Sequence, residues 1–296
     1  MSHLSRREFL GQSALTLGSL AATRTLVSGA ETAAKITSPT DQVTLGKTGI
    51  KTSLIGMGTG SNGVKHSSNQ MRLGHDGFTK LVRYAFDQGI SYFDTADQYG
   101  SHIYLRDGLK GLPREKLFIQ TKTRATTAEM ARADIERFRE ELGTDYLDTL
   151  LMHCMTKSSW PTDFRPVMDV LSDAKSKGRV RAVGVSCHGL APLQSAVKCD
   201  WVEVDLARIN PVGGNAGRMD GTPEEVAACL QTMHRQGKGI LGMKILAEGT
   251  LKTPQQIQKS LQFVLGLGCV NAFVIGFESP QQIDQIFRYT QDVLKA

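Results

Sequence analysis

Four side chains that can carry or transfer protons lie at the ends of three segments that read as short buried strands. Asp94 and Tyr99 follow the first segment, Lys122 ends the second and His153 ends the third. In barrels and doubly wound sheets, the carboxyl ends of parallel strands meet at one rim. A lysine beside a phenol stabilises the phenolate and lowers its pKa, a carboxylate fixes the lysine, and a histidine can orient a substrate oxygen. The pattern predicts a proton-transfer site.

Each of these residues also has an ordinary structural explanation. An aspartate after a strand often caps a turn, a tyrosine or histidine often completes a core, and a lysine at a strand end is usually solvated. Their joint occurrence at successive strand ends weakens these explanations, because chance would have to place four titratable types at equivalent positions. We therefore expect Asp94, Tyr99, Lys122 and His153 to act together.

Strand and helix patterns alternate along the rest of the chain, as is typical of a parallel α/β fold. Strands are expected at residues 54–58, 91–94, 117–121, 148–152, 180–185, 202–206, 239–243 and 271–275. Helices are expected at residues 75–89, 101–110, 127–142, 165–177, 189–197, 223–236, 254–265 and 280–291. Eight strands and eight helices within residues 43–296 predict one α/β domain, a (β/α)8 TIM barrel.

Several of these segments resemble the aldo-keto reductase family. They are Asp94-Thr95-Ala96 with Tyr99-Gly100, Gln120-Thr121-Lys122, Leu150-Leu151-Met152-His153 and the run 45–60. The resemblance covers roughly residue 43 to the C-terminus. It implies a barrel whose lower end is capped by an N-terminal β-hairpin, here residues 43–45 and 51–53 around Gly46-Lys47-Thr48-Gly49.

The resemblance also implies a function. Members of the family are NAD(P)(H)-dependent oxidoreductases of the EC 1.1.1 type, which interconvert an aldehyde, ketone or sugar carbonyl and its alcohol by hydride transfer. The catalytic roles would be Tyr99 as general acid/base, Lys122 and Asp94 as the groups that tune it, and His153 as the group that orients the carbonyl. The reaction would need NADP or NAD as cofactor and a small-molecule carbonyl or alcohol substrate.

In the family, cofactor contacts come from the loops after the last four barrel strands. The matching positions here are Ser186, Cys187, Met243, Lys244, Leu246, Gly276, Glu278 and Gln282. This chain departs from the family pattern where Cys187 replaces an asparagine, Leu206 replaces a glutamine and Met243 replaces an aromatic residue. These departures leave open which residues contact the carboxamide group and the ring of the nicotinamide.

The end of the last strand bears on the choice of cofactor. Relatives that prefer NADPH place lysine or arginine here to bind the adenosine 2′-phosphate, whereas this chain has Glu278 and Gln282. A carboxylate repels a phosphate dianion and accepts a hydrogen bond from a ribose hydroxyl. We therefore expect a weakened preference for NADPH. The sequence leaves open whether the protein uses NAD(H).

Substrate contacts are harder to place. His153 is one candidate because the family uses it to orient the carbonyl. Trp160, in the loop after the strand that ends in His153, is the other, since it could wall the pocket or stack on a sugar ring. Packing of Trp160 into the structure is an equal alternative.

The N-terminus reads as a targeting segment. Ser5-Arg6-Arg7-Glu8-Phe9-Leu10 resembles the twin-arginine export signal, a weakly apolar region follows, and Ala30 ends a plausible cleavage site. We expect residues 1–30 to be this signal peptide, residues 31–42 to be a linker, and the twin-arginine translocation machinery to deliver the protein to the periplasm or outside. An amphipathic helix with two surface arginines is the alternative.

The net charge, the length of the apolar run and the cysteine spacing argue against several other classes of protein. The net charge of +6 falls to +4 without residues 1–30, which hold three arginines and one glutamate. Because the chain has no run of basic residues, nucleic acid is not an expected partner. The apolar run of the predicted signal peptide is too short to span a membrane, so no stable membrane insertion of the mature chain is expected. The five cysteines show no metal spacing, so neither a metal site nor a disulfide framework is expected.

Two other functions remain open. One is a nucleotide-binding regulatory or interaction protein on the same fold with little turnover, which the departures at Cys187, Leu206 and Met243 favour and the complete tetrad disfavours. The other is a sugar isomerase or lyase, which would need a metal cluster or a carbinolamine lysine that the spacing does not support.

Overall fold

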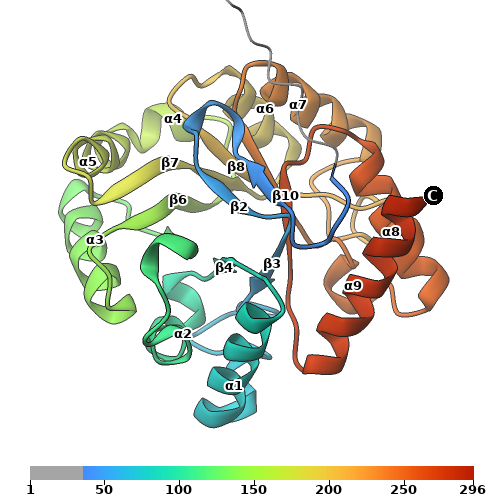
Figure 1. Ribbon diagram of the computed structural model, residues 1–296. Helices are drawn as coiled ribbons and strands as arrows, with labels where there is room; N and C mark the ends of the chain where they lie inside the picture. The colour runs from blue at the N-terminus through green and yellow to red at the C-terminus, as the bar shows by residue number, and fades with distance from the viewer. Residues whose placement is uncertain (1–35) are drawn as a thin grey trace, which may run out of the picture. The chain divides into compact units, whose positions relative to one another are not determined.

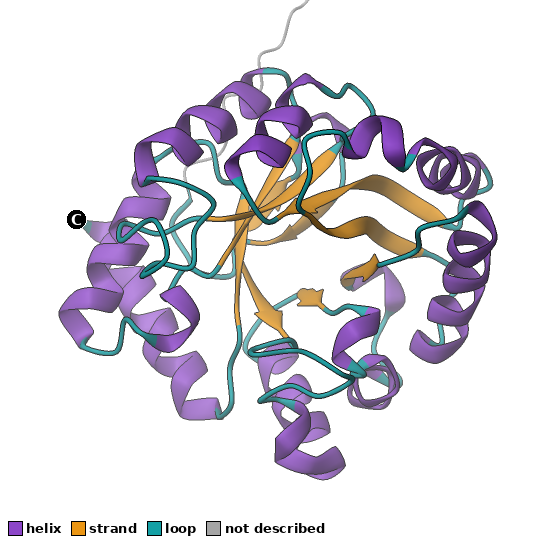
Figure 2. Ribbon diagram, turned by 180° about the vertical axis from the view of Figure 1, so that it is seen from behind, coloured by secondary structure: helices purple, strands orange, loops and turns teal. Residues whose placement is uncertain are grey.

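The computed structural model describes residues 36–296. Within them, eight parallel strands close into a barrel in the order β10-β3-β4-β5-β6-β7-β8-β9, and helices lie around it (Figures 1 and 2). The barrel strands are β3 (Ile55–Gly58), β4 (Tyr92–Asp94), β5 (Phe118–Thr123), β6 (Leu147–Met155), β7 (Val180–Cys187), β8 (Val204–Arg208), β9 (Gly239–Met243) and β10 (Ala272–Ile275). The prediction of a (β/α)8 barrel is confirmed.

Nine α-helices occur in this part of the chain. They are α1 (Gly74–Asp87), α2 (His102–Leu109), α3 (Ala128–Leu142), α4 (Trp160–Asp163), α5 (Arg165–Ser176), α6 (Leu190–Lys198), α7 (Pro223–Arg235), α8 (Pro254–Gly266) and α9 (Pro280–Lys295). Eight of them agree with the expected helices to within four residues at each end. The short α4 was not predicted, because four residues are too few to show a helical period.

Side-chain caps determine where the last three helices begin. Thr222 accepts a hydrogen bond from the backbone of Glu225, and Thr253 accepts one from the backbone of Gln256; both pairs form complete capping boxes. Ser279 caps α9 in the same way, although without the reciprocal bond. Because each cap is followed by proline, the loops at the ends of β8, β9 and β10 stop at defined residues.

The barrel has two hydrophobic layers, as the alternation of strand side chains requires. In β8, Val204 and Leu206 belong to the cluster inside the barrel, whereas Ala207 belongs to the layer between strands and helices. Leu45 and Ile50 join the interior cluster from the hairpin of β1 (Gln42–Thr44) and β2 (Lys51–Ser53). The hairpin therefore closes one end of the barrel, as predicted.

Glycine is required at the turn of this hairpin. Gly46 has a φ of +49°, and a Cβ atom there would lie 2.3 Å from the carbonyl oxygen of Gly237. The backbone of Lys47 donates a hydrogen bond to the same oxygen at 2.7 Å. The turn can thus approach the start of β9 closely only without a side chain.

The predicted signal peptide at residues 1–30 lies outside the described residues, as does the first part of the predicted linker. The rest of that linker packs with the barrel. The backbone of Ile55 donates a hydrogen bond to Pro39 and that of Leu54 donates one to Asp41, at 3.2 and 3.0 Å. Ile36 contacts the hydrophobic core. The described part of the predicted linker, from residue 36 onward, therefore belongs to the same compact unit as the barrel.

Candidate active site

Three residues of the predicted tetrad lie on neighbouring strands, and two of them form a buried ion pair. Lys122 Nζ donates to Asp94 Oδ1 at 2.6 Å and to the backbone oxygen of Thr95 at 2.8 Å. Gln120 Nε2 donates to the same Asp94 oxygen at 2.7 Å. Lys122 is 1% exposed and Asp94 is 5% exposed, so each charge depends on the other for its stability. This pair fixes the ammonium group of Lys122 at the rim.

Tyr99 lies between this pair and His153. The ammonium nitrogen of Lys122 is 5.0 Å from the centre of the Tyr99 ring, and the Tyr99 and His153 rings meet edge to face at 5.8 Å. Two glycines of the loop after β3 contact the ring: a Cβ atom at Gly60 would lie 2.2 Å from it, and one at Gly63 would lie 2.4 Å from it. The structure thus brings all four predicted catalytic residues together.

The pKa of Tyr99 differs from the expectation of an acidified phenol. Burial raises it well above the ordinary value for a tyrosine, and the nearby Asp94 carboxylate adds to the effect. Lys122 does not reverse this shift, because its charge is already paired with Asp94 and burial lowers its own pKa. In this structure Tyr99 is therefore a protonated phenol at neutral pH, which suits a proton donor better than a base.

His153 is a neutral imidazole. Burial lowers its pKa well below the usual value, and the positive charges of Lys122 and Arg124 lower it further. Its Nδ1 atom has no hydrogen-bond partner among the described residues, although it is buried. A buried polar atom without a partner is costly. The ring is therefore suited to form a hydrogen bond with a ligand oxygen.

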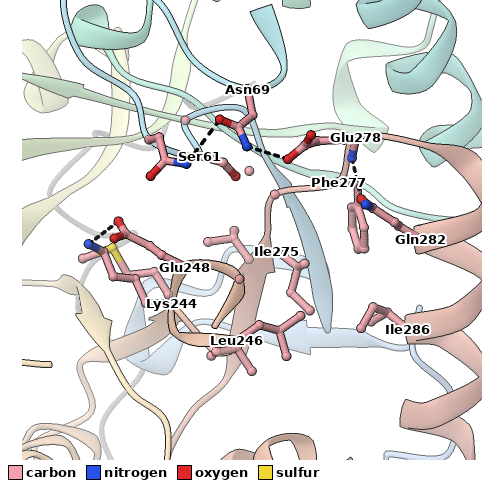
Figure 3. Close-up of a pocket in the computed structure, with 18 of the residues that line it drawn as sticks. Ser61, Asn69, Lys244, Leu246, Glu248, Ile275, Phe277, Glu278, Gln282 and Ile286 are labelled. Carbon is pink, nitrogen blue, oxygen red and sulfur yellow. Dashed lines mark hydrogen bonds and ion pairs between the residues drawn. The ribbon is translucent and has the colours of Figure 1, made fainter. Parts of the chain in front are cut away.

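A cavity of about 550 Å³ adjoins the tetrad (Figure 3). Asp94 and Tyr99 line one part of it, and Glu278 and Gln282 line another. Six of the eight predicted cofactor positions contribute to its wall: Met243, Lys244, Leu246, Gly276, Glu278 and Gln282. The loops after β9 and β10 therefore form one surface with the proton-transfer site.

Five predicted site residues do not line this cavity: Lys122, His153, Ser186, Cys187 and Trp160. Ser186 is 1% exposed and its hydroxyl accepts a hydrogen bond from the backbone of Cys154 at 3.0 Å. Cys187 is fully buried in the layer between strands and helices. Trp160 is also fully buried, and its indole nitrogen donates to the Pro192 carbonyl at 3.1 Å. The structure therefore places Trp160 in the packing between α4 and α6 rather than on a pocket wall, since its ring fills that core.

Ion pairs and hydrogen bonds fix the charged groups of the cavity (Figure 3). Glu278 accepts a hydrogen bond from Asn69 Nδ2 at 2.6 Å, and its backbone donates to Gln282 Oε1 at 2.7 Å. Lys244 Nζ donates to Glu248 Oε1 at 2.6 Å. Glu278 is thus held as a hydrogen-bond acceptor on this part of the cavity wall.

Several lining residues were not predicted from the sequence. The loop after β3 supplies Ser61, Asn62 and Asn69, and the loop after β9 supplies Lys252. The only sequence signal for the first loop is the glycine and polar run at 58–63, which is typical of a close backbone approach. Nothing in the local sequence indicated that Asn69 lines the cavity, because its hydrogen-bond partner Glu278 is 209 residues away.

The cavity wall fits a nicotinamide dinucleotide. The volume lies in the range of ordinary cofactor pockets. Lys252 supplies positive charge for phosphates, while Lys244 is paired with Glu248. Apolar side chains, including Leu246, Ile257 and Ile286, offer surfaces for the rings. Residues 36–296 contain no cluster of three or more His, Cys, Asp or Glu side chains arranged to hold a metal ion, and no helix among them is both long and apolar enough to cross a membrane.

Comparison with known proteins agrees with the family resemblance seen in the sequence. The model of the aldo/keto reductase family matches residues 54–264. The chain is 28% identical over 185 residues to probable aldo-keto reductase 1 of Glycine max, covering 54% of this chain and 51% of the relative. It is 31% identical over 153 residues to L-galactose dehydrogenase of Arabidopsis thaliana, covering 48% and 47%.

A third curated relative is the NADH-specific methylglyoxal reductase of Escherichia coli, 26% identical over 175 residues and covering 51% of each chain. The chain thus spans about half the length of the curated relatives it matches. Among solved structures, a putative aldo-keto reductase from Pseudomonas aeruginosa superposes with a TM-score of 0.72 at 22% identity, covering 87% of this chain and 97% of that one. At this identity the likeness supports the fold alone.

Proposed function

Because the chain belongs to the aldo/keto reductase family, we propose that it is an NAD(P)(H)-dependent oxidoreductase that interconverts a carbonyl compound and its alcohol. The observation that carries this proposal is the shared cavity, which Tyr99 and Asp94 line together with the predicted cofactor positions of β9 and β10. A cofactor bound along that wall would lie beside the proton donor.

The residues of the tetrad have separate roles in the proposed mechanism. The bound nicotinamide supplies or accepts the hydride; the protein supplies position and the proton. Tyr99, whose pKa is raised, donates its proton to the carbonyl oxygen during reduction. Lys122 and Asp94 hold positive and negative charge beside the phenol. The neutral ring of His153 orients the carbonyl oxygen.

Two assays test this proposal. The first identifies any nucleotide that the purified protein releases on denaturation, and the second follows aldehyde-dependent oxidation of NADH and NADPH. Bound nicotinamide nucleotide together with aldehyde turnover would support the enzyme. Nucleotide binding without turnover of any aldehyde or sugar would instead support a regulatory protein, the alternative that the buried Cys187 and Leu206 favour by replacing two carboxamide contacts.

We propose further that the cofactor is NAD(H) rather than NADP(H), because Glu278 stands where a phosphate-binding cation would be needed. Wild-type protein should then bind NADH about 10-fold more tightly than NADPH, since a carboxylate repels the 2′-phosphate. Replacing Glu278 with glutamine should reduce this difference, and Glu278→Lys should reverse it. Dissociation constants from fluorescence titration measure the effect.

The matched control for Glu278→Gln is Glu224→Gln, which removes an exposed carboxylate on α7 outside the cavity. It should leave the ratio of the two dissociation constants unchanged. Tighter binding of NADPH than of NADH by the wild-type protein would contradict the proposed preference, and would point to Lys252 as the phosphate-binding group.

We also propose export by the twin-arginine route, on the evidence of Arg6 and Arg7 in their sequence context. Cell fractionation of a bacterial host that makes the full chain tests this. A cytosolic product with residues 1–30 intact would contradict it.

A further inference from the structure

Arg124 lies at the mouth of the barrel, directly beside the tetrad. It directly follows β5, two residues after Lys122, and its positive charge contributes to the lowered pKa of His153. Lys122 is 1% exposed, whereas Arg124 is exposed. The Arg124 side chain therefore lies nearer the solvent than that of Lys122.

A hydrogen-bond chain ties Arg124 to the segment that carries Tyr99. Its Nη1 atom donates to Gln98 Oε1 at 2.5 Å, and Gln98 directly precedes Tyr99. Gln98 Nε2 in turn donates to the carbonyl of Gly63 at 2.8 Å, in the loop that contacts the Tyr99 ring. The chain keeps the guanidinium group near the mouth although its side chain is long.

Arg124 differs from three cations near the tetrad in having only a neutral partner. Lys122 is paired with Asp94, Arg208 with Asp220, and Lys244 with Glu248. Within residues 36–296, no carboxylate lies within 4.0 Å of the Arg124 guanidinium group; its one hydrogen-bonded side chain is the amide of Gln98. The positive charges of these three residues are compensated locally, and that of Arg124 is not.

The two histidines near the mouth carry no positive charge at neutral pH. Burial lowers the pKa of His188 to about 3, and the cations Arg208, Lys244 and Arg124 contribute. The pKa of His153 is lowered as well, by burial first and then by neighbouring cations. An anion beside the tetrad would therefore meet the uncompensated charge of Arg124.

We propose that the substrate is a carbonyl compound that carries a carboxylate, and that Arg124 binds this carboxylate at the mouth of the barrel. A guanidinium group has five N–H donors in a fork that matches a carboxylate, and Gln98 uses one of them. The carbonyl would lie at Tyr99 and His153 while the carboxylate lies nearer the solvent, at Arg124. This inference rests on the proposed oxidoreductase function.

The test compares two aldehydes of similar shape, 4-carboxybenzaldehyde and 4-methylbenzaldehyde, by their kcat/KM values. Wild-type protein should favour the carboxylated aldehyde by at least about 10-fold, the range of a charge-assisted hydrogen bond. Arg124→Gln should bring the ratio close to one, and Arg124→Lys should give an intermediate ratio because a point charge replaces the fork. The ratio cancels any effect that a substitution has on the amount of active protein.

The matched control is Arg132→Gln, which removes an arginine on α3 whose side chain is 65% exposed. It should leave the ratio unchanged. If Arg124→Gln turns over both aldehydes with the wild-type ratio, the carboxylate site is wrong and the proposed reductase function stands. If the wild-type protein turns over neither aldehyde, the proposed function fails, and equal binding of benzoate by wild type and Arg124→Gln would overturn the carboxylate site as well.

Discussion

Replacing Tyr99 with phenylalanine is expected to lower kcat for carbonyl reduction by about 10²–10⁴-fold, the usual contribution of a positioned general acid. The change removes only the hydroxyl group. The phenylalanine ring keeps its contacts with Gly60 and Gly63, whose backbones approach the ring too closely to allow a Cβ atom. Single-turnover oxidation of enzyme-bound reduced nicotinamide measures the hydride step directly.

The dissociation constant for the cofactor serves as the control for this substitution. It should change by less than about 3-fold, because Tyr99 contributes a ring to the cavity and the ring remains. A fall in kcat of less than 10-fold would mean that another group delivers the proton. In that case, loss of activity in His153→Gln with full activity in Tyr99→Phe would assign the role to the histidine.

The raised pKa of Tyr99 also gives the direction of its pH dependence. A phenol whose pKa lies above the ordinary value keeps its proton throughout the neutral and mildly alkaline range. Ionisation of Tyr99 should therefore not reduce the rate of carbonyl reduction as the pH rises from 6 to 9. Alcohol oxidation requires the phenolate, so its rate should increase with pH over the same range.

The barrel and the tetrad could be predicted because both depend on local patterns. Each strand end is a short apolar run followed by a polar turn, and the helices predicted to start at residues 223, 254 and 280 start there in the structure, directly after the caps Thr222, Thr253 and Ser279. Asp94, Lys122 and His153 come together because they occupy equivalent ends of adjacent parallel strands. Parallel pairing in sequence order converts that local regularity into a shared rim.

The rest of the site depends on contacts between distant segments, which local patterns do not contain. Asn69 reaches the cavity through a loop whose path is set by Gln70 and by packing near β10. Trp160 was equally suited to a pocket wall and to packing, and the structure shows that α4 turns its ring into the core. The expected acidification of Tyr99 is opposite to the shift that burial imposes on its pKa, since spacing shows which groups are near and not how deeply they are buried.

A buried carboxyl group outside the cavity gives the largest expected effect on stability. Asp205 lies in β8 between Val204 and Leu206, which face the barrel interior, so its own side chain faces the layer between strands and helices. It is fully buried, and neither of its oxygens has a hydrogen-bond partner among the described residues. Burial, with a smaller contribution from Asp220, raises its pKa to about 8.

This shift makes the free energy of unfolding fall as the pH rises. Below the ordinary pKa of 3.8, Asp205 is protonated in both states and has no effect. Between that value and about 8, the folded protein keeps the proton and the unfolded chain releases it, so each pH unit costs about 1.4 kcal/mol. Above about 8 both states are ionised, and the cost is constant. The sign is opposite to that of a salt-bridged aspartate, which stabilises the fold as the pH rises.

Asp205→Asn should therefore gain stability over the wild type by about 1.4 kcal/mol per pH unit between pH 5 and 8, because asparagine is neutral in both states. Urea denaturation of both proteins at several pH values measures this difference. The slope is the informative quantity, since it is independent of any fixed change in packing that the amide introduces.

The matched control is Asp87→Asn, which neutralises an exposed carboxylate at the end of α1. Its free energy of unfolding should change with pH in parallel with that of the wild type. Parallel curves for Asp205→Asn and the wild type would show that the folded barrel does not hold a proton at Asp205, and would imply that a water molecule or a rearranged side chain solvates the carboxylate.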